Sequence, residues 1–346
     1  MKFLRGSKKE FFEFVNLINE DDKIGILTHT DLDGIASGIF LKEILKAKGL
    51  KVEFIEFMDL KSGMMKEIIP RLRKEKLTKI FMTDLAVDRI DLKGFYEAQK
   101  EFDIISIDHH PMEEIPEGRG LIKTESEDCI AWVMYNFGKR IINQDKWRWL
   151  VCAGMVAEYS FNKKEHYNFI QKNYSDFGKP SKFNSSIGKI TNIISYSLVY
   201  FSEDKRKVYD LVQKNNLKEL EKHYFEVKKE IDFWVSNFKE KAEYFPEKGI
   251  YFYEIKPKFR VSSIIMSMLS AKGHDKVYAS ILRRDDGTIK ISIRNQGGNV
   301  DVNLLMQKGC EGLKNATGGG HSKASGAVFM EGDLEKFKEN VLKALK

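Results

Sequence analysis

A histidine and two aspartates lie within five residues of one another, between an apolar run and a helical pattern. The stretch reads "HTDLDG" and contributes His29, Asp31 and Asp33. Two further apolar runs end in the same residue types: "KIFMTD" ends at Asp84, and "DIISIDHH" ends in one aspartate and two histidines at positions 108–110. Acidic and imidazole side chains therefore follow three separate apolar runs.

The number of acidic groups indicates the chemistry. A single aspartate after a strand is usually a helix N-cap or a turn residue, and Asp84 alone would favour that explanation. Four aspartates and three histidines are hard to explain by capping, because carboxylates packed together repel one another. Divalent cations remove this repulsion, and a mixed Asp and His set suits Mn²⁺ better than Ca²⁺. Two cations bridged by a carboxylate would activate water for attack on phosphorus.

The runs and the segments between them predict how these side chains are positioned. Short apolar runs alternate with helical patterns, which is typical of βαβ units and a parallel sheet. Ligands of such sheets bind outside the carboxyl ends of the strands, so all three groups should meet at one edge. The predicted strands are residues 24–29, 52–57, 79–84 and 103–108, and the predicted helices are residues 35–48, 64–76 and 91–102.

The length of 346 residues predicts two domains. Residues 161–245 are lysine-rich and helical, and we expect them to extend the first domain and then connect it to the second. Pro246 and Gly249 indicate the boundary, which gives domains of residues 1–245 and 246–346. The second begins as another α/β unit, with a hairpin turn at residues 286–287 and a final amphipathic helix.

Composition limits the class of protein. The net charge of +7 mildly favours phosphate-bearing partners, but it does not identify a class of protein by itself. The three cysteines form no zinc pattern and fit a reducing compartment. No apolar run is long enough for a membrane span or a signal peptide, so we expect a cytoplasmic protein that does not bind membranes.

A second group of residues could bind an anion. Arg294 ends the predicted strand "SIRNQ", and "ATGGGHSKASG" is read as a glycine-rich loop that enters another strand. Glycine backbone N–H groups can close around a phosphate because no Cβ is in the way, although many such loops are simple turns. The predicted anion clamp comprises Arg294, Gly318, Gly319, Gly320 and His321. Three other histidines, His166, His223 and His274, fit no pattern and are expected at the surface.

Four motifs in sequence order carry a resemblance to a known family. "HTDLDG", "TDL", "IDHHP" and "GGGHSKASG" resemble the DHH phosphoesterase superfamily with its DHH-associated C-terminal domain. The resemblance covers roughly residues 20–160 and 250–335. It implies a parallel-sheet N-terminal catalytic domain and a smaller α/β C-terminal domain, with the active site in the cleft between them. The position of His29, two residues before Asp31, is more similar to archaeal RecJ-like proteins.

The same resemblance implies roles for the metal ligands. Asp31 and Asp33 would each hold a cation, and Asp84 would bridge the two. His109 would complete one coordination sphere, and His29 would reach the first cation or orient its ligands. Two Mn²⁺ ions are expected, with Mg²⁺ as the alternative.

Other roles follow from the resemblance. Asp108 would fix the tautomer of a neighbouring imidazole, and His110 would face the scissile phosphate or the leaving oxygen. The family usually has one more aspartate, where "AGMVAEYS" offers Glu158 instead. Asp145 and Asp176 are alternatives for this ligand. In the second domain, Arg294 and His321 would bind a substrate phosphate or the terminal nucleotide.

These residues predict a Mn²⁺-dependent exonuclease that releases mononucleotides from single-stranded DNA or RNA, in a DNA-repair context. A small-molecule phosphodiesterase or oligoribonuclease is the first alternative, acting on cyclic di-adenylate, dinucleotides or 3′-phosphoadenosine phosphate. An inactive scaffold of a replication or repair complex is the second, although such relatives lose metal ligands that are present here. Partners would be single-stranded nucleic acid or short oligonucleotides, with replication or repair proteins and a second copy of the chain left open.

Overall fold

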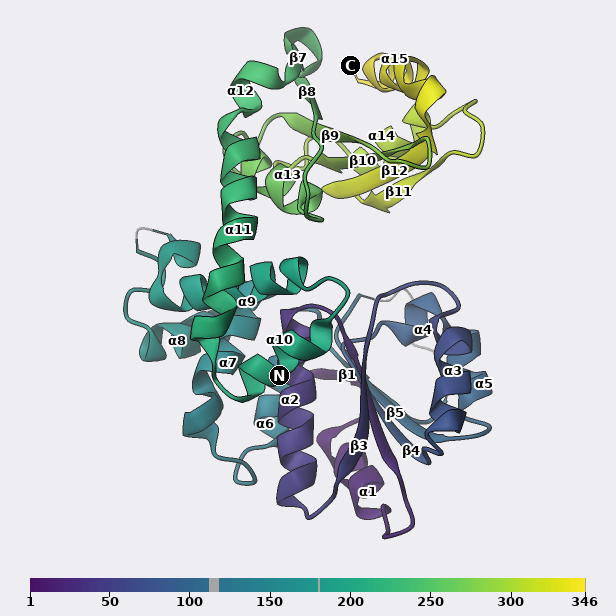
Figure 1. Ribbon diagram of the computed structural model, residues 1–346, viewed down its shortest axis with the longest axis vertical. Coiled ribbons are helices and arrows are strands. Elements are labelled where there is room, and N and C mark those ends of the chain that lie inside the picture. The colour runs from purple at the N-terminus through teal and green to yellow at the C-terminus, as the bar shows by residue number, and fades with distance from the viewer. Residues whose placement is uncertain (112–117, 180, 346) are drawn as a thin grey trace. The chain divides into compact units, whose positions relative to one another are not determined.

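The computed structural model describes residues 1–111, 118–179 and 181–345, which form two compact units, Met1–Tyr224 and Phe225–Lys346 (Figure 1). Each unit contains a six-stranded sheet. Helix α11 (Leu217–Ser236) begins in the first unit and ends in the second. The boundary that the sequence indicated lies within the second unit, at the 3-10 turn η3 (Pro246–Lys248). In the part of the chain that is described, no helix combines the length and the apolarity of a membrane span.

The first sheet has the strand order β1-β6-β5-β4-β2-β3. Strands β2 to β6 run parallel, and β1 pairs antiparallel with β6 at one edge. The four predicted strands are confirmed, whereas β1 and β6 were not predicted because both are too short for a clear pattern. The bounds are β1 (Phe3–Arg5), β2 (Ile24–His29), β3 (Val52–Met58), β4 (Lys79–Thr83), β5 (Asp103–Asp108) and β6 (Leu121–Thr124).

Helices cover both faces of this sheet, as its doubly buried strands require (Figure 1). Phe81 of β4 faces one apolar core, while its neighbours Ile80 and Met82 face the other. The first core contains α1 (Lys8–Asn16), α2 (Leu32–Ala47), α6 (Ile130–Phe137) and α7 (Gln144–Ala157). The second contains α3 (Met64–Lys74), the short α4 (Val87–Ile90) and α5 (Leu92–Ala98).

The helical extension of the first unit packs on the side of α7. Helix α9 lies against α7 and α10, and α10 also contacts α2. These helices carry Ile187, Ile194 and Val208 into the larger core. The elements are η1 (Ser160–Asn162), α8 (Lys164–Asn173), η2 (Lys182–Asn184), α9 (Ser186–Tyr200) and α10 (Lys205–Gln213).

The second unit has the sheet order β11-β12-β10-β9-β8-β7. One face packs its apolar side chains against α14 and α15, and α13 lies against β9 and β10. The predicted hairpin is confirmed as β9–β10. The bounds are α12 (Phe238–Lys241), β7 (Glu243–Phe245), β8 (Ile250–Glu254), α13 (Ser262–Ser270), β9 (Val277–Arg283), β10 (Thr288–Arg294), α14 (Val302–Gly309), β11 (Thr317–His321), β12 (Ala324–Met330), η4 (Glu331–Asp333) and α15 (Leu334–Ala344).

The glycine-rich segment that was predicted as a loop is strand β11. It pairs antiparallel with β12 along its whole length, so the ladder satisfies its backbone groups on that side. Gly318 explains one of the three glycines: a Cβ there would lie 2.8 Å from the Met306 carbonyl oxygen, so only glycine lets α14 pack this closely. On the other edge, the Gly320 N–H donates to Asn303 Oδ1 at 2.9 Å.

His166 was expected at the surface, and this prediction was wrong. The side chain is fully buried beside Asp128, with Nε2 3.0 Å from Asp128 Oδ1. Lys163 Nζ lies 2.8 Å from the same oxygen, and the Lys2 N–H donates to the other. Burial raises the pKa of Asp128, but these hydrogen bonds and the Lys163 charge outweigh burial and hold the pKa well below its usual range.

Asp128→Asn should destabilise the first unit, because a neutral amide would replace the buried carboxylate that Lys163, His166 and the Lys2 N–H share. At pH 7 we expect the free energy of unfolding to fall by about 3–5 kcal/mol. A carboxyl with a depressed pKa contributes stability above its unfolded pKa of about 4 and loses it as the pH falls. The difference between variant and wild type should therefore shrink in acid. Urea unfolding at pH 7 and in acid checks both statements.

Glu125→Gln is the matched control. It removes a carboxylate charge from the same loop. Glu125 pairs with the exposed Lys2 ammonium and, at 3.7 Å, with Lys163, but its side chain is only partly buried and should matter little. Equal stability of Asp128→Asn and the wild type at pH 7 would contradict the assignment of Asp128 as a buried anchor.

Candidate metal centre

Three neighbouring parallel strands deliver acidic and imidazole groups to one edge of the first sheet. His29 is the last residue of β2, Asp84 follows β4, and Asp108 ends β5 and precedes two histidines. Strand β4 lies between β2 and β5 and pairs with both. Asp84 is therefore central, as parallel strands bring their carboxyl ends to the same edge.

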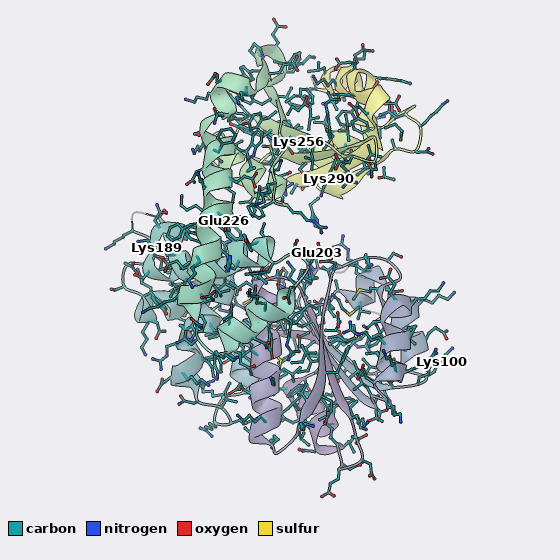
Figure 2. All side chains as sticks on the ribbon, viewed as in Figure 1. Lys100, Lys189, Glu203, Glu226, Lys256 and Lys290 are labelled. Atoms are coloured by element: carbon teal, nitrogen blue, oxygen red, sulfur yellow. The ribbon has the colours of Figure 1, made fainter. Side chains whose placement is uncertain are left out.

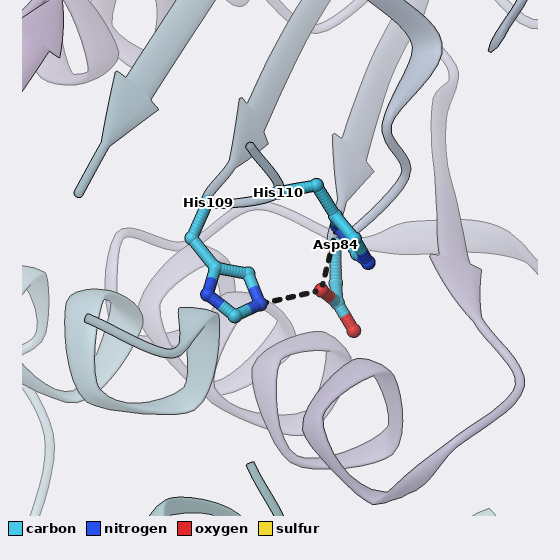
Figure 3. Close-up of side chains that lie close together, drawn as sticks. All are labelled: Asp84, His109 and His110. Atoms are coloured by element: carbon cyan, nitrogen blue, oxygen red, sulfur yellow. Dashed lines mark ion pairs between the residues drawn. The ribbon is translucent and has the colours of Figure 1, made fainter. Parts of the chain in front are cut away.

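Asp84 is buried, with a relative exposure of 1%, and each of its oxygens faces a different group. Oδ2 lies 3.4 Å from His29 Nδ1. Oδ1 lies 3.4 Å from His109 Nε2, a contact drawn in Figure 3. Oδ1 accepts no hydrogen bond from any described residue. The backbone at Asp84 has φ +61°, which lies in the left-handed region that residues other than glycine, asparagine and aspartate rarely adopt. Its N–H donates to the Ile107 carbonyl at 3.0 Å, which holds this conformation in place.

The ring of His109 is oriented to present a lone pair to this centre. Its Nδ1 lies 2.8 Å from the Ser126 carbonyl oxygen, which can only accept a hydrogen bond. Nδ1 therefore carries the proton, and Nε2 of the neutral ring is free to bind a cation. Nε2 is the atom that faces Asp84 at 3.4 Å and Asp33 at 3.7 Å.

On the other side of Asp84, His29 and Asp31 form a second group. His29 Nδ1 lies 2.9 Å from Asp31 Oδ2. Asp31 is also the N-cap of α2, because its Oδ1 accepts the Gly34 N–H at 3.0 Å. Burial lowers the pKa of His29, but Asp31 and then Asp84 outweigh it and raise the pKa to about 11.

The turn between β2 and α2 depends on Gly34. A Cβ at this position would lie 2.2 Å from the His29 carbonyl oxygen, so any side chain would push the helix away from the strand. Below the turn, the Thr28 hydroxyl donates to the Gly34 carbonyl at 2.6 Å. These contacts fix the spacing of His29 and Asp31 on their side of Asp84.

These side chains fit divalent cations. Ligand atoms of His29, Asp31 and Asp84 lie within 4.8 Å of one another, and so do those of Asp84, His109 and His110. Asp84 belongs to both groups, and no described residue donates a hydrogen bond to its buried Oδ1. A cation on each side of Asp84 would satisfy that oxygen and offset the repulsion between carboxylates. The mixed nitrogen and oxygen donors suit borderline metals such as Mn²⁺.

Asp33 is fully buried, and it binds the first turn of α6. Its Oδ2 accepts the Ile130 N–H and its Oδ1 accepts the Ala131 N–H, each at 2.7 Å. Burial, and then the charge of Asp84, raises the pKa of Asp33 to about 7. Each carboxylate oxygen still has a second lone pair, so these contacts are compatible with the predicted role as a ligand.

Glu158 is the C-terminal cap residue of α7. The pKa of Glu158 is raised well above the usual range. Burial is the largest cause, and the charges of Asp31, Asp33 and Asp84 act in the same direction. The carboxyl group therefore lies within electrostatic reach of the three aspartates. Asp145 and Asp176, the alternatives to Glu158, are committed elsewhere: Asp145 pairs with Arg148, and Asp176 caps the turn before α9 through Ser186.

His110 differs from His109 in how its ring is held. Its Nδ1 lies 2.9 Å from Asp108 Oδ1, and its backbone N–H donates to Asp108 Oδ2 at 3.0 Å. The same Nδ1 is 3.8 Å from Asp84 (Figure 3). Because Nδ1 is committed as a donor to Asp108, it is a poor cation ligand, and Nε2 is the atom left for other chemistry. Burial lowers the pKa of His110, but Asp108 outweighs it and raises the pKa.

Sequence reasoning missed the residue that holds Asp108. Lys123 of β6 is almost fully buried, and its Nζ lies 2.5 Å from Asp108 Oδ2 and 2.7 Å from Asp88 Oδ2. Burial raises the pKa of Asp108, but His110 and Lys123 lower it by more, so the pKa lies well below its usual range. A lysine in the apolar run "LIKT" was the available signal, since a lysine in a buried strand needs an acidic partner.

The predicted anion-binding residues all lie in the second unit. Arg294 ends β10, and its guanidinium donates to the Ser263 hydroxyl at 2.6 Å and to the Ile293 carbonyl at 2.9 Å. Burial lowers its pKa, and among the described residues no carboxylate pairs with it. His321 ends β11 directly opposite Ala324 of β12. A partly buried guanidinium without an acidic partner is suited to bind an anion.

Two family descriptions match the chain. Residues 23–177 match the "DHH family, N-terminal domain", and residues 247–346 match the "DHHA1 domain". The chain belongs to the DHH superfamily. Together these matches cover both ends of this DHH protein and confirm the resemblance that its motifs carry. No curated protein sequence matches it.

Solved structures share the fold of this DHH protein. A crystal structure of exonuclease RecJ bound to manganese has a TM-score of 0.75 at 14% identity and covers 100% of this chain and 95% of that one. RecJ from Thermus thermophilus with Mn²⁺ has a TM-score of 0.72 at 14% identity, covering 98% of this chain and 54% of that one. CDC45 from Entamoeba histolytica has a TM-score of 0.61 at 11% identity, covering 98% of each chain.

These comparisons confirm the predicted α/β fold with an N-terminal DHH domain and a C-terminal DHHA1 domain. At these identities the structural likeness concerns the fold alone. The family, together with the acidic and imidazole groups around Asp84, supports a metal-dependent phosphoesterase.

Asp84→Asn should abolish the binding of two cations, because each oxygen of Asp84 faces a different ligand group. Asparagine tolerates a positive φ, so the variant avoids the backbone strain that alanine would add. Loss of one repelling charge should leave the metal-free protein at least as stable as the wild type. Mn²⁺ titration by calorimetry and metal analysis of the purified protein check this. Asp59→Asn, an exposed site just after β3, is the control and should keep both ions.

Lys123→Met should destabilise the fold, because Asp88 and Asp108 would remain buried without a counter-charge. We expect a loss of about 3–5 kcal/mol in the free energy of unfolding of the metal-free protein. In an Asp88→Asn background the same substitution should cost less, since one carboxylate no longer needs compensation. Denaturant unfolding of the four proteins measures this coupling, and strict additivity would show that the Asp88–Lys123 pair contributes nothing.

Proposed function

We propose that this protein is a Mn²⁺-dependent exonuclease that releases mononucleotides from single-stranded DNA or RNA. The observation that carries the proposal is the buried Asp84, whose Oδ2 faces His29 and whose Oδ1 faces His109, each at 3.4 Å. A carboxylate shared between two ligand groups is the arrangement that a two-cation phosphodiester hydrolase requires. When bound, such cations supply a hydroxide nucleophile and stabilise charge on the phosphoryl oxygens.

The residues around Asp84 divide into two sets in this proposal. His29 and Asp31 form one side. His109 forms the other, joined by Asp33 and, in place of the usual aspartate, by Glu158. The Ser126 carbonyl keeps the lone pair of His109 directed inward. Mn²⁺ is favoured over Mg²⁺ because two donors are imidazole nitrogens, and RecJ of Thermus thermophilus has been solved with either ion.

His110 is proposed to act on the substrate. Asp108 holds Nδ1, which leaves Nε2 as the donor or acceptor of the half-buried ring. Asp108 also raises the pKa of His110, so the ring can hold the proton that the leaving oxygen needs. Lys123 in turn keeps Asp108 charged and in place, and it has no direct contact with the reacting groups in this scheme.

The second unit is proposed to bind the substrate phosphate through Arg294 and His321. Arg294 has no acidic partner in the described part of the chain and can offer a bidentate contact to a phosphate. Nucleic acid is the proposed substrate because the structures that share this fold include an exonuclease. A place in DNA repair, alongside replication or repair proteins, is part of the same proposal.

Two alternatives make different predictions. A small-molecule phosphodiesterase would prefer cyclic di-adenylate, dinucleotides or 3′-phosphoadenosine phosphate. A scaffold related to CDC45 would hydrolyse nothing. The scaffold is disfavoured because His29, Asp31, Asp84 and His109 converge within the distances that cations need.

The deciding experiment compares labelled single-stranded DNA, single-stranded RNA, duplex DNA, cyclic di-adenylate and 3′-phosphoadenosine phosphate, with Mn²⁺, with Mg²⁺ and in excess chelator. We expect mononucleotide release from the single strands, fastest with Mn²⁺, and none in chelator or with Asp84→Asn. Arg294→Ala should lower kcat/KM by about 10- to 100-fold and keep its metal. Faster hydrolysis of cyclic di-adenylate would favour the small-molecule alternative, and activity in chelator would exclude a metal mechanism.

A further inference from the structure

One face of the second sheet is not part of the apolar core. Ile289, Ile291 and Ile293 of β10 point into the core with α14 and α15, so the alternating residues Lys290 and Arg294 point to the opposite face. Figure 2 shows Lys290 on the side of the sheet away from α15. Cross-strand pairing extends this face over β12 and β11, since residues directly opposite one another share a face.

Towards Arg294, the part of this face over β11 and β12 carries mostly small residues, whereas Val328 and Thr317 stand on it beside Lys290. Arg294 pairs with Ala324, and Ser292 pairs with Gly326. On the next strand, Gly319 lies opposite Gly326 and His321 lies opposite Ala324. At this end, small residues on two adjacent strands leave a flat strip of backbone, beside which the side chains of Arg294 and His321 stand. A flexible chain could lie along such a strip in close contact with the sheet.

Two cations of β10 stand on this face, Arg294 beside the strip of small residues and Lys290 beyond it. Lys290 and Arg294 are four residues apart on one strand, which corresponds to about 13 Å. They cannot contact the same phosphate group at this distance. Successive phosphates of a polymer can reach both, whereas a single phosphate subsite needs only Arg294 and His321.

Lys290 is not neutralised by the protein. In the described part of the chain it forms no ion pair, unlike Arg283 of β9, which pairs with Glu254 and Glu331. Burial lowers the pKa of Lys290, and so do the charges of Arg284 and Arg260. A lysine without an acidic partner among the described residues favours an anionic ligand.

We propose that Lys290 binds an internal phosphate of a single-stranded nucleic acid whose terminal phosphate lies at Arg294 and His321, so that the β10–β12 face is a track for the substrate backbone. This inference rests on the proposed function and deepens it. A substrate long enough to reach Lys290 gains a contact that a dinucleotide lacks. The enzyme should then favour oligonucleotides over the dinucleotides and cyclic dinucleotides of the alternative function.

The test measures binding and hydrolysis as a function of strand length, from dinucleotide to decanucleotide, for the full chain. Binding is followed by fluorescence anisotropy in chelator, and hydrolysis by kcat/KM with Mn²⁺. Lys290→Ala should bind the decanucleotide roughly three- to tenfold more weakly than the wild type and the dinucleotide equally well. The salt dependence of decanucleotide binding should become shallower by about 0.7 in log–log slope, the value for one lost phosphate contact on a single strand.

Two variants serve as controls. Lys343→Ala removes an equal charge from α15, which packs on the other face, and should behave as the wild type at every length. Arg294→Ala should weaken binding of every strand, short or long. Equal behaviour of Lys290→Ala and Lys343→Ala would overturn the track, as would a loss that is the same for dinucleotide and decanucleotide. If the wild type shows no gain with length, the exonuclease proposal fails with it. If the wild type gains with length and Lys290→Ala keeps that gain, the track alone fails.

Discussion

Repulsion between buried carboxylates is the constraint on which the first unit depends. Asp31, Asp33, Asp84 and Glu158 lie within electrostatic reach of one another, and the fold withdraws several of them from water. Without cations, protonation of the carboxylates relieves this repulsion. The pKa of Asp33 is therefore raised to about 7, and that of Glu158 well above its usual range. A site that collects this much negative charge, and in which no described residue donates to one oxygen of Asp84, is organised for a ligand of opposite charge.

One short segment after β6 supports both sides of this arrangement. The Ser126 carbonyl sets the tautomer of His109, and the backbone N–H groups of Ile130 and Ala131 hold Asp33. Asp128 lies between them and is anchored from the opposite side by Lys163 and His166. A buried ionic contact that is remote from the acidic cluster therefore fixes the chain that positions it. In the same way, the buried ammonium of Lys123 holds Asp108 in place.

The sequence was sufficient for the elements with strong periodicity and for the residues at strand ends. Four parallel strands and the convergence of His29, Asp84 and His109 follow from apolar runs and from the rule that ligands bind at carboxyl ends. Strands β1 and β6 are too short to show a periodic pattern. Because β6 was not predicted, the role of Lys123 could not be inferred either. "GGGH" was assigned to a loop because glycine disfavours strands, but close packing against α14 requires glycine at Gly318. His166 was misplaced because its partner Asp128 is distant in sequence, and contacts of that kind leave no local signal.

The strand order also dictates a sequence of events during synthesis. β1 leaves the ribosome before the other strands of its sheet, yet it pairs with β6, where Phe3 lies opposite Thr124. A nascent chain that ends after β4 and Asp84 already carries Asp31, Asp33 and Asp84, but it lacks the histidines that follow β5 and the segment that holds Asp33. Long-range pairings of this kind form late and slowly. The acidic edge therefore exists before the residues that neutralise or orient it, and the earliest strand of this sheet is among the last to find its neighbour.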